Sequence, residues 1–397
     1  MNGSSKEQLD SSHLFNTLDL EKEIECDSSY STGQILSSMN SEPDTLARNV
    51  FINHLNSNLG DPALFPGTYK IEKHVITILG NLVQLPSSGT GLILSGGSEA
   101  NVTALWAIRN KNISNFKVNG GNIPEIIAPK SVHVSIDKAA NLLGLKLIKI
   151  PTTPQYQINL KAVAETISSK TIALIGVAGT TALGTIDPLF KLNKICLDNN
   201  LDFHIDAAFG GLVFPFLQDS KEKFHLSFEL EALASMTIDI HKMGHVPIPG
   251  GGLLWRNTSY PKTIQFTLPY LSGSPKQNTI SGTRSGASAV AFASLWDHLG
   301  YNGFKEIVSR CISNTKYLTK ELDKRGFLIP IKPVINILGV KTPIDFPKDI
   351  FSLHQDLWTH GWTTTVVNGF LRFVIMPPTK RHHLEELLNL IDELIDK

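Results

Sequence analysis

The sequence predicts an α/β fold, in which a large domain with a mostly parallel sheet is followed by a smaller α+β domain. Three observations lead to this class. Short apolar runs alternate with helical stretches between about residues 90 and 206, as parallel strands joined by crossover helices do. The runs are apolar almost throughout, as strands covered on both faces must be. After about residue 290 long helices and then strand-like runs replace the alternation.

The first half of the chain is assigned element by element from this pattern. Residues 1–28 are polar, and at most one short helix is expected there. Apolar residues at helical spacing predict helices over 44–57 and 70–85. Strands are expected over 91–95, 125–129, 145–151, 171–179 and 201–206. Helices are expected over 96–111, 135–144, 159–167 and 188–199.

The second half predicts the smaller domain. Helices are expected over 286–299 and 304–325, and an amphipathic helix over 380–395 ends the chain. Strands are expected over 326–330, 335–342, 363–367 and 370–377. The predicted division is an N-terminal segment over 1–60, a large domain over 61–290 and a small C-terminal domain over 291–397, which the chain length can support.

Composition narrows the class of protein. Of 397 residues, 42% are hydrophobic and 18% charged, and 36 basic residues balance 36 acidic ones, so nothing favours a nucleic-acid partner. Cys26, Cys196 and Cys311 form no disulfide framework and no metal-binding spacing. No signal peptide and no membrane span is recognisable. A cytoplasmic protein without a metal site is therefore expected.

One lysine is placed unusually. SMTIDIHKMGHVPIPGGG, residues 235–252, sets Lys242 between an apolar run and a Gly- and Pro-rich stretch. Lysines are ordinarily solvated surface groups, but lysine amines also form Schiff bases with carbonyl cofactors. The glycines after Lys242 would let the backbone pack around a planar ring. Lys242 is therefore the candidate covalent anchor for a cofactor.

An aspartate ends a predicted strand. Asp206 closes the run LDFHID and is followed by Ala207 and Ala208. Ligands of open α/β sheets bind beyond the carboxyl ends of the strands. A carboxylate there can hold a pyridine nitrogen protonated, and small alanines leave room for a flat ring. Alternatively, Asp206 caps the turn that follows it.

Two further segments follow strands. GGSEAN, residues 96–101, opens a helix, and helix N-termini bind phosphate, although Ser98 could equally be a simple N-cap. His133 follows the strand-like EIIAP, where its ring could stack on a bound aromatic group or serve as an ordinary histidine.

With these groups in this order, the chain resembles the group II amino-acid decarboxylases that depend on pyridoxal 5′-phosphate (PLP), and among them the archaeal L-tyrosine/L-aspartate decarboxylase family. The resemblance covers about residues 28–390. It rests on the motifs YSTGQILSSMN, NLGDPALFPGT, GGSEAN, HVSIDKAAN, VAGTTALGTIDP, HIDAAFGG, TIDIHKMGHVPIPGGG, PYLSGSPKQNTISGTRSG and LRFVIMP. It implies the PLP-dependent transferase fold of the aspartate aminotransferase type (fold type I), with the large domain binding PLP.

The resemblance also implies roles for residues of the site. Lys242 would carry PLP as a Schiff base, Asp206 would pair with the ring nitrogen, and His133 and Ala208 would lie against the two faces of the ring. Contacts to the phosphate or the phenolic oxygen are implied for Gly97, Ser98, His241 and Thr180. In this fold the active site lies at a homodimer interface, and Thr283 in ISGTRSG would reach the phosphate of the neighbouring subunit.

Two residues would act on the substrate. Arg372 in FLRFVIMP matches the arginine expected to bind a substrate carboxylate, or it is a strand-edge arginine in solvent. Tyr270 in LPYLSGSPKQN matches a tyrosine on a loop that protonates the substrate carbon in related decarboxylases, or it is a packing aromatic. His133 and the freed Lys242 are the other candidates for that proton transfer.

The expected reaction is decarboxylation of an L-amino acid with release of carbon dioxide. L-Aspartate giving β-alanine, a precursor of coenzyme A, is favoured by the family. L-Tyrosine giving tyramine is the alternative, since no pocket residue decides between them. A carbon–carbon lyase of the sphingosine-phosphate lyase type shares the framework but would be expected to carry an apolar anchor. A catalytically silent PLP-binding protein is the third alternative.

Overall fold

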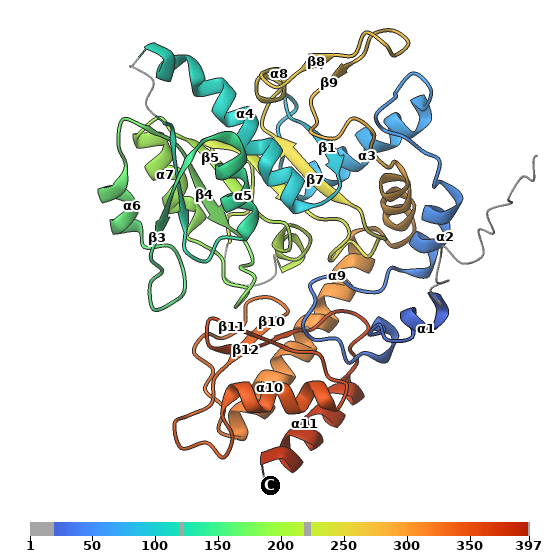
Figure 1. Cartoon of the computed structure of the whole chain (residues 1–397), viewed down its shortest axis with the longest axis vertical. Coiled ribbons are helices and arrows are strands. Elements are labelled where there is room, and N and C mark those ends of the chain that lie inside the picture. The colour runs from blue at the N-terminus through green and yellow to red at the C-terminus, as the bar shows by residue number, and fades with distance from the viewer. Residues whose placement is uncertain (1–19, 119–122, 218–223, 396–397) are drawn as a thin grey trace, which may run out of the picture.

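The computed structural model describes residues 20–118, 123–217 and 224–395. A seven-stranded sheet forms the large part of this structure, and a three-stranded sheet lies below it in Figure 1. The large sheet has the order β1 (Thr90–Leu94), β7 (Gly251–Trp255), β6 (Leu233–Ile238), β5 (Asp202–Asp206), β4 (Thr171–Val177), β2 (Glu125–Pro129) and β3 (Lys146–Ile150).

The large sheet is mostly parallel, which confirms the predicted class. Strands β2 to β6 pair in parallel, and only β7 runs antiparallel to its neighbours β1 and β6. The helices that follow in this part of the chain are α4 (Gly97–Val118), α5 (Val134–Leu143), α6 (Leu160–Thr166), α7 (Leu189–Asp198) and the short α8 (Ser259–Lys262). Short 3-10 turns follow β5 at Gly210–Leu212 and Phe214–Leu217.

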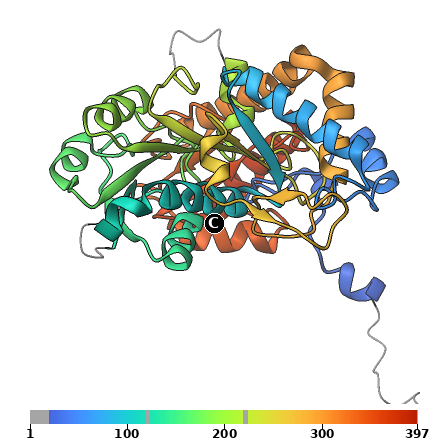
Figure 2. The same cartoon turned by 90° about the horizontal axis from the view of Figure 1, so that it is seen from above.

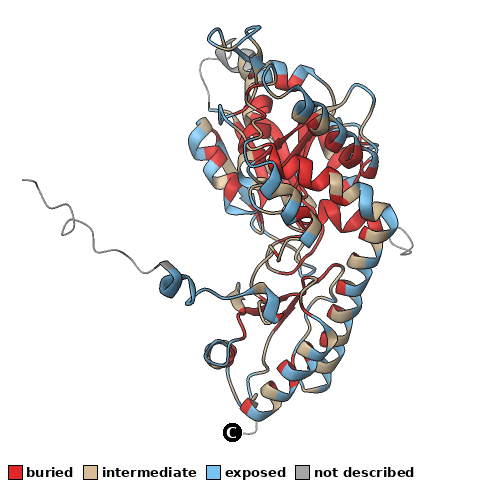
Figure 3. Ribbon diagram, turned by 90° about the vertical axis from the view of Figure 1, so that its right-hand side faces the viewer, coloured by how far each residue is buried: buried red, intermediate tan, exposed pale blue. Residues whose placement is uncertain are grey.

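The two faces of this sheet carry separate hydrophobic cores, because neighbouring strand residues point to opposite faces. Leu92 and Leu94 of β1 pack in one core with α4 and α5, whereas Ile93 packs in the other with α3 (Pro66–Leu82) and α7. The view from above in Figure 2 shows helices on both sides of the strands, and Figure 3 shows the buried residues concentrated there.

The small sheet has the order β10 (Ile337–Val340), β12 (Phe370–Val374) and β11 (Thr365–Val367). It packs with α10 (Ile350–Thr359) and α11 (Arg381–Ile395) around a third core. The expected strand over 326–330 is wrong, since Leu328 makes only an isolated bridge to Lys341.

A long helix, α9 (Ala287–Lys324), contributes to both parts. Its helical backbone is interrupted at Gly300, where φ is +59°. This break separates the two helices that were predicted over 286–299 and 304–325. In α9 the earlier residue Phe304 packs in the large core, and the later residue Leu318 packs in the small core.

The N-terminal segment also meets the small sheet. It contains α1 (Leu20–Ile24), a 3-10 turn at Tyr30–Thr32, and α2 (Thr45–Asn53). Between them the Leu36 N–H donates to the Thr363 carbonyl at 2.9 Å, and the Val374 N–H donates to the Leu36 carbonyl at 2.8 Å. The predicted domain boundaries at residues 60 and 290 stay predictions. In the described residues no helix is both long and apolar enough to span a membrane.

Candidate active site

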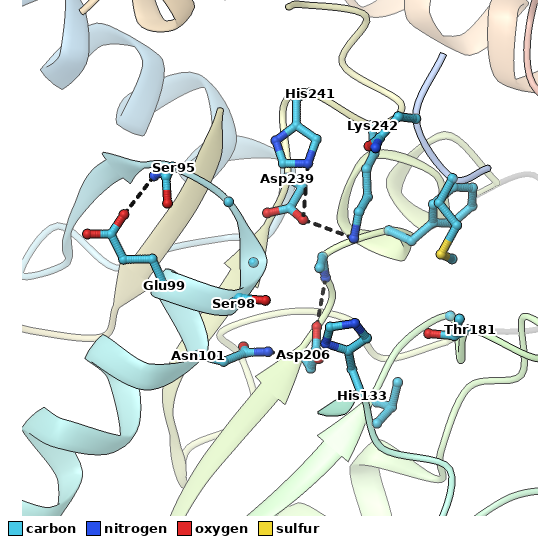
Figure 4. Close-up of a pocket in the computed structure, with 18 of the residues that line it drawn as sticks. Ser95, Ser98, Glu99, Asn101, His133, Thr181, Asp206, Asp239, His241 and Lys242 are labelled. Atoms are coloured by element: carbon cyan, nitrogen blue, oxygen red, sulfur yellow. Dashed lines mark hydrogen bonds and ion pairs between the residues drawn. The ribbon is translucent and has the colours of Figure 1, made fainter. Parts of the chain in front are cut away.

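A cavity of about 390 Å³ opens beyond the carboxyl ends of β4, β5 and β6. This edge is where an open α/β sheet binds its ligands. Figure 4 shows side chains entering the cavity from the starts of α4 and α5 and from the loops after β5 and β6. Among the predicted site residues the structure brings together Gly97, Ser98, His133, Asp206, Ala208, His241 and Lys242.

Asp206 is the last residue of β5, and its carboxylate is almost fully buried. Its Oδ1 accepts a hydrogen bond from the Ala208 N–H at 3.2 Å, which is the turn-capping contact foreseen as an alternative. Its Oδ2 accepts a second bond from Asn101 Nδ2 at 2.9 Å. The residue therefore caps its turn and lines the cavity at once.

Lys242 lies just beyond β6, and its side chain is 19% exposed. Its ammonium pairs with Asp239, with Nζ 2.9 Å from Oδ2. The Asp239 side chain is 1% exposed, and its Oδ1 has no hydrogen-bond partner among the residues that the structure describes. Sequence reasoning missed Asp239 because it stands inside TIDIH, which resembles an apolar strand. An acid three residues before the candidate lysine was the available clue.

His241 faces the same region. Its Nδ1 accepts a hydrogen bond from the Gly250 N–H at 3.2 Å, which leaves the proton of the neutral ring on Nε2. Burial lowers the pKa of His241 below its usual value. The ring is therefore suited to donate one hydrogen bond without adding a full charge.

The start of α4 forms another wall. The helix begins at Gly97, so Ser98 is its second residue and not its N-cap. The first turn is closed by Glu99, whose Oε2 accepts from the Ser95 N–H at 2.8 Å. The free amides of a helix N-terminus attract anions, which makes this wall suitable for a phosphate.

His133 is the N-cap of α5. Its Nδ1 accepts from the Ser135 N–H at 3.2 Å and lies 3.0 Å from Ser135 Oγ. Because Nδ1 acts as an acceptor, the proton of the neutral ring lies on Nε2. The cap fixes the position of the ring at the cavity edge.

These residues fit PLP, the cofactor that the resemblance implies. A Cβ added at Gly97 would stand 2.8 Å from Asp239 Oδ2 and 3.0 Å from the Ala208 Cβ, so no side chain fits there. The amine of Lys242 can hold an aldehyde, and the carboxylate of Asp206 can hold a ring nitrogen protonated. The start of α4 can hold a phosphate.

Thr180 and Arg372 lie behind the cavity wall. The Thr180 hydroxyl is turned to Thr185, with 2.8 Å between their Oγ1 atoms, while the neighbouring Thr181 lines the cavity. Arg372 on β12 is 6% exposed, which excludes the strand-edge position in solvent. Its Nη1 donates to the Thr181 carbonyl at 2.9 Å, and its Nη2 donates to the Ser37 carbonyl.

Tyr270 and Thr283 are not brought to this cavity within one chain. Tyr270 lies between β8 (Phe266–Thr267) and β9 (Lys276–Gln277), and it is 77% exposed, so it is not a packing aromatic. Thr283 is exposed in the segment before α9. Met39 and Asn40 also line the cavity, from the N-terminal segment.

Known proteins match the chain over most of its length. The model of the pyridoxal-dependent decarboxylase conserved domain matches residues 18–339. A probable L-tyrosine/L-aspartate decarboxylase of Methanothermobacter thermautotrophicus is 40% identical over 90% of this chain and 96% of its own. The L-aspartate decarboxylase of Thermococcus kodakarensis is 39% identical over 95% of both chains. An L-aspartate/L-glutamate decarboxylase of Pyrococcus horikoshii is 39% identical over 93% and 94%.

Solved structures share the fold. Glutamate decarboxylase of Lactobacillus brevis superposes with a TM-score of 0.87 at 22% identity, covering 100% of this chain and 94% of its own. Sphingosine-1-phosphate lyase of Burkholderia pseudomallei gives a TM-score of 0.84 at 21% identity, covering 92% and 86%. At such identities these two show the fold alone, whereas the family match and the relatives near 40% identity decide membership. The chain therefore belongs to the pyridoxal-dependent decarboxylase family and uses PLP as its cofactor.

Proposed function

We propose that this decarboxylase removes the α-carboxylate of L-aspartate and releases β-alanine and carbon dioxide. The observation that carries the chemistry is that the Lys242 amine and the Asp206 carboxylate enter one cavity from the ends of neighbouring strands (Figure 4). Bound PLP supplies an electron sink for the pair released when the bond between Cα and the carboxylate breaks. The broken bond is replaced by a bond from Cα to a proton.

The residues of the chain would divide the work. Lys242 would hold the aldehyde through its amine, and Asp206 would hold a proton on the ring nitrogen. His241 and the first turn of α4 would bind the phosphate. His133, with its proton on Nε2, would cover the ring, and His133, Lys242 or a neighbouring subunit's Tyr270 would deliver a proton to the substrate carbon.

The preference for aspartate rests on the relatives, and one buried cation is the candidate for binding a substrate carboxylate. Three relatives at 39–40% identity carry aspartate in their names. Arg372 is the cation, and the carbonyls it binds belong to Thr181, which lines the cavity, and to Ser37, two residues before the cavity residue Met39. Within the described part of the chain, the Nε of Arg372 has no hydrogen-bond partner. A guanidinium so placed is suited to a carboxylate.

A side-by-side assay tests the substrate. Purified enzyme loaded with PLP is given L-aspartate, L-tyrosine or L-glutamate at equal concentrations, and carbon dioxide and the amine product are measured. Aspartate should have the highest kcat/KM. The name of the Methanothermobacter relative also includes tyrosine. A higher kcat/KM for tyrosine than for aspartate would make tyrosine the proposed substrate instead. No release from any of the three would remove the proposed function.

The cofactor role of Lys242 has a separate test. Lys242→Ala should abolish the visible absorbance of the covalently held cofactor, while non-covalent PLP can still bind. Borohydride treatment of the wild-type protein should attach the cofactor to the Lys242 peptide, as mass analysis would show. Attachment to another lysine would remove Lys242 from its proposed role.

A homodimer with a shared site is the remaining part of the proposal. Thr283 and Tyr270 lie outside the cavity of their own chain, so both would act on a neighbouring subunit. Co-purified mixtures of Lys242→Ala and Tyr270→Phe chains should regain up to about a quarter of wild-type activity if each site draws these residues from different chains. No regain from two inactive parents would mean that each site draws Lys242 and Tyr270 from the same chain, whereas full activity of Tyr270→Phe alone would remove Tyr270 from the mechanism. A cytoplasmic location is proposed with it.

A further inference from the structure

Asn101 in α4 connects the cavity to the interior of the sheet. It is 1% exposed, and its amide makes four hydrogen bonds. Its Nδ2 donates to Asp206 Oδ2 and to Ser135 Oγ, each at 2.9 Å. Its Oδ1 lies 2.8 Å from Thr237 Oγ1 and 3.0 Å from His204 Nε2, both of which can donate.

These contacts allow a single orientation of the amide. Turning it over would place Oδ1 against the Asp206 carboxylate, so two acceptors would face each other. The same logic puts the proton of His204 on Nε2, because Asn101 Oδ1 can only accept. His204 Nδ1 then accepts from Ser235 Oγ at 2.9 Å. Burial lowers the pKa of His204 to about 4, so the ring is neutral at pH 7.

The orientation has a consequence for the charge on Asp206. A proton between a buried carboxylate and a pyridine nitrogen can rest on either atom. A hydrogen bond donated to the carboxylate stabilises its ionised form. The Asn101 donor therefore favours the arrangement in which the proton stays on the nitrogen, and that arrangement makes the ring a better electron sink.

We propose that Asn101 is a positioning residue that keeps Asp206 ionised and aimed at the pyridine nitrogen of PLP. Thr237 and His204 hold the Asn101 amide in its working orientation from β6 and β5. Through Ser135, which contacts His133 Nδ1, the same amide supports the second group placed against the ring. The inference rests on the proposed role of Asp206.

The test measures the protonation of the ring nitrogen directly. Apoprotein is loaded with PLP labelled with ¹⁵N in the ring, and the chemical shift is recorded at pH 7. In the wild type it should be that of a protonated pyridine. In Asn101→Leu, which keeps the bulk but removes the donor, the shift should move toward the unprotonated value. Carbon dioxide release should fall roughly 10- to 100-fold, as for the loss of a hydrogen bond to a charged group.

Asn193→Leu is the matched control. Asn193 in α7 is 7% exposed, and its Oδ1 accepts from the Ala232 N–H at 2.9 Å, outside the cavity. This variant should lose stability but keep the wild-type shift. If Asn101 were merely structural, both leucine variants would melt earlier with the ring nitrogen still protonated, and the proposal would be overturned.

Thr237→Val keeps the proposal testable if Asn101→Leu does not fold. It is nearly isosteric and removes one donor to Asn101 Oδ1, so a smaller shift in the same direction is expected. An unchanged shift in Thr237→Val, with Asn101→Leu unfolded or also unchanged, counts against the proposal. Borohydride labelling of Lys242 in the wild type separates the two failures. No label there would sink the proposed function, whereas a label without any shift change would sink only the role of Asn101.

Discussion

The Nζ atom of Lys242 lies 2.9 Å from Oδ2 of Asp239, so the amine meant for a carbonyl cofactor is held by a carboxylate three residues earlier in the chain. The pair lies in the cavity, and the carboxylate is the more deeply buried partner. If the Lys242 amine binds a carbonyl group instead, the Asp239 carboxylate loses this cation. A buried charge without a partner is costly, so this pair affects both the stability and the chemistry of the site.

A double-mutant cycle on the apoprotein should reveal the coupling. Lys242→Met removes the lysine cation from the buried Asp239 and leaves, among the described residues, only the longer contact to His241, whose Nε2 lies 3.9 Å from Oδ2. We expect the variant to lower the free energy of unfolding by about 2–4 kcal/mol. Adding Asp239→Asn removes the stranded charge, so the double variant should be more stable than Lys242→Met. Urea unfolding measures both. The surface pair of Lys149 and Asp137, with side chains 36% and 40% exposed, is the control and should couple by less than about 1 kcal/mol. Equal coupling in the two pairs would contradict the prediction.

Substitution of Arg372 should weaken substrate binding without weakening cofactor binding. Burial lowers the pKa of Arg372 below its usual value, yet among the described residues it makes no ion pair. Arg372→Lys keeps the charge but loses the forked geometry, so KM for aspartate should rise at least about tenfold. The dissociation constant of PLP, measured by equilibrium dialysis, should stay within about twofold. A lowered melting temperature with unchanged KM would show that the arginine serves the fold alone.

The parallel strands were predictable because burial on both faces makes them apolar throughout. Strands β2, β4 and β5 are buried at every residue, and each matches an expected run. Strand β7 escaped detection because it starts with Gly251 and Gly252, in a stretch that reads as a loop. A Cβ at Gly252 would stand 2.9 Å from the Ile238 carbonyl oxygen, so close packing against β6 requires the glycine.

The site was predictable where a residue stands at the end of a strand. Asp206 and Lys242 follow recognisable runs, and the carboxyl edge of a sheet gathers its ligands. Asn101 gives no such indication, because it looks like any polar residue of a helix. Its meaning comes from contact with Asp206, 105 residues later in the chain. Local patterns do not report contacts of that range.

A second buried pair supports the segment that contains Thr283. Glu72 is fully buried, and its Oε1 accepts from Arg284 Nη1 at 2.8 Å and from the Ile93 N–H at 2.9 Å. Glu72→Gln should lower the free energy of unfolding by about 3–5 kcal/mol, because it leaves the guanidinium without its counter-ion. Urea unfolding checks this value.

The control for this pair is on the surface. Glu165→Gln disrupts the exposed pair with Lys161 and should change stability by less than about 0.5 kcal/mol. If the Arg284 segment also contacts a second subunit, the Glu72→Gln dimer should dissociate at a higher protein concentration than the wild-type dimer, as measured by sedimentation. An equal and small effect of both variants on stability would contradict the buried-pair argument.

The loop after Lys242 should give the protein an acid-sensitive element. His245 is buried, and burial lowers its pKa to about 4, with Asp44 opposing this shift and Arg310 adding to it. An unfolded histidine has a pKa near 6.5, so between about pH 6.5 and 4 the unfolded chain binds the proton that the folded chain refuses. Stability from this group is therefore present above pH 6.5 and is lost as the pH falls. At pH 5 the loss should be about 2 kcal/mol.

His245→Asn should remove that loss. Asparagine tolerates the positive φ of +55° at this position, so the backbone can remain as it is. The variant should lose about 2 kcal/mol less than the wild type between pH 7 and pH 5, measured as free energy of unfolding in urea. His298→Asn, at an exposed position of α9, should track the wild type.

Two other buried groups also make the stability depend on pH. His204, whose pKa is also about 4, adds the same loss to every variant, while Asp187, whose pKa is raised to about 6, acts in the opposite direction. Because His204 and Asp187 are present in all three proteins, the difference in pH dependence between His245→Asn and the wild type comes from His245. Parallel curves of unfolding free energy against pH would mean that the pKa of His245 is not lowered in the folded protein.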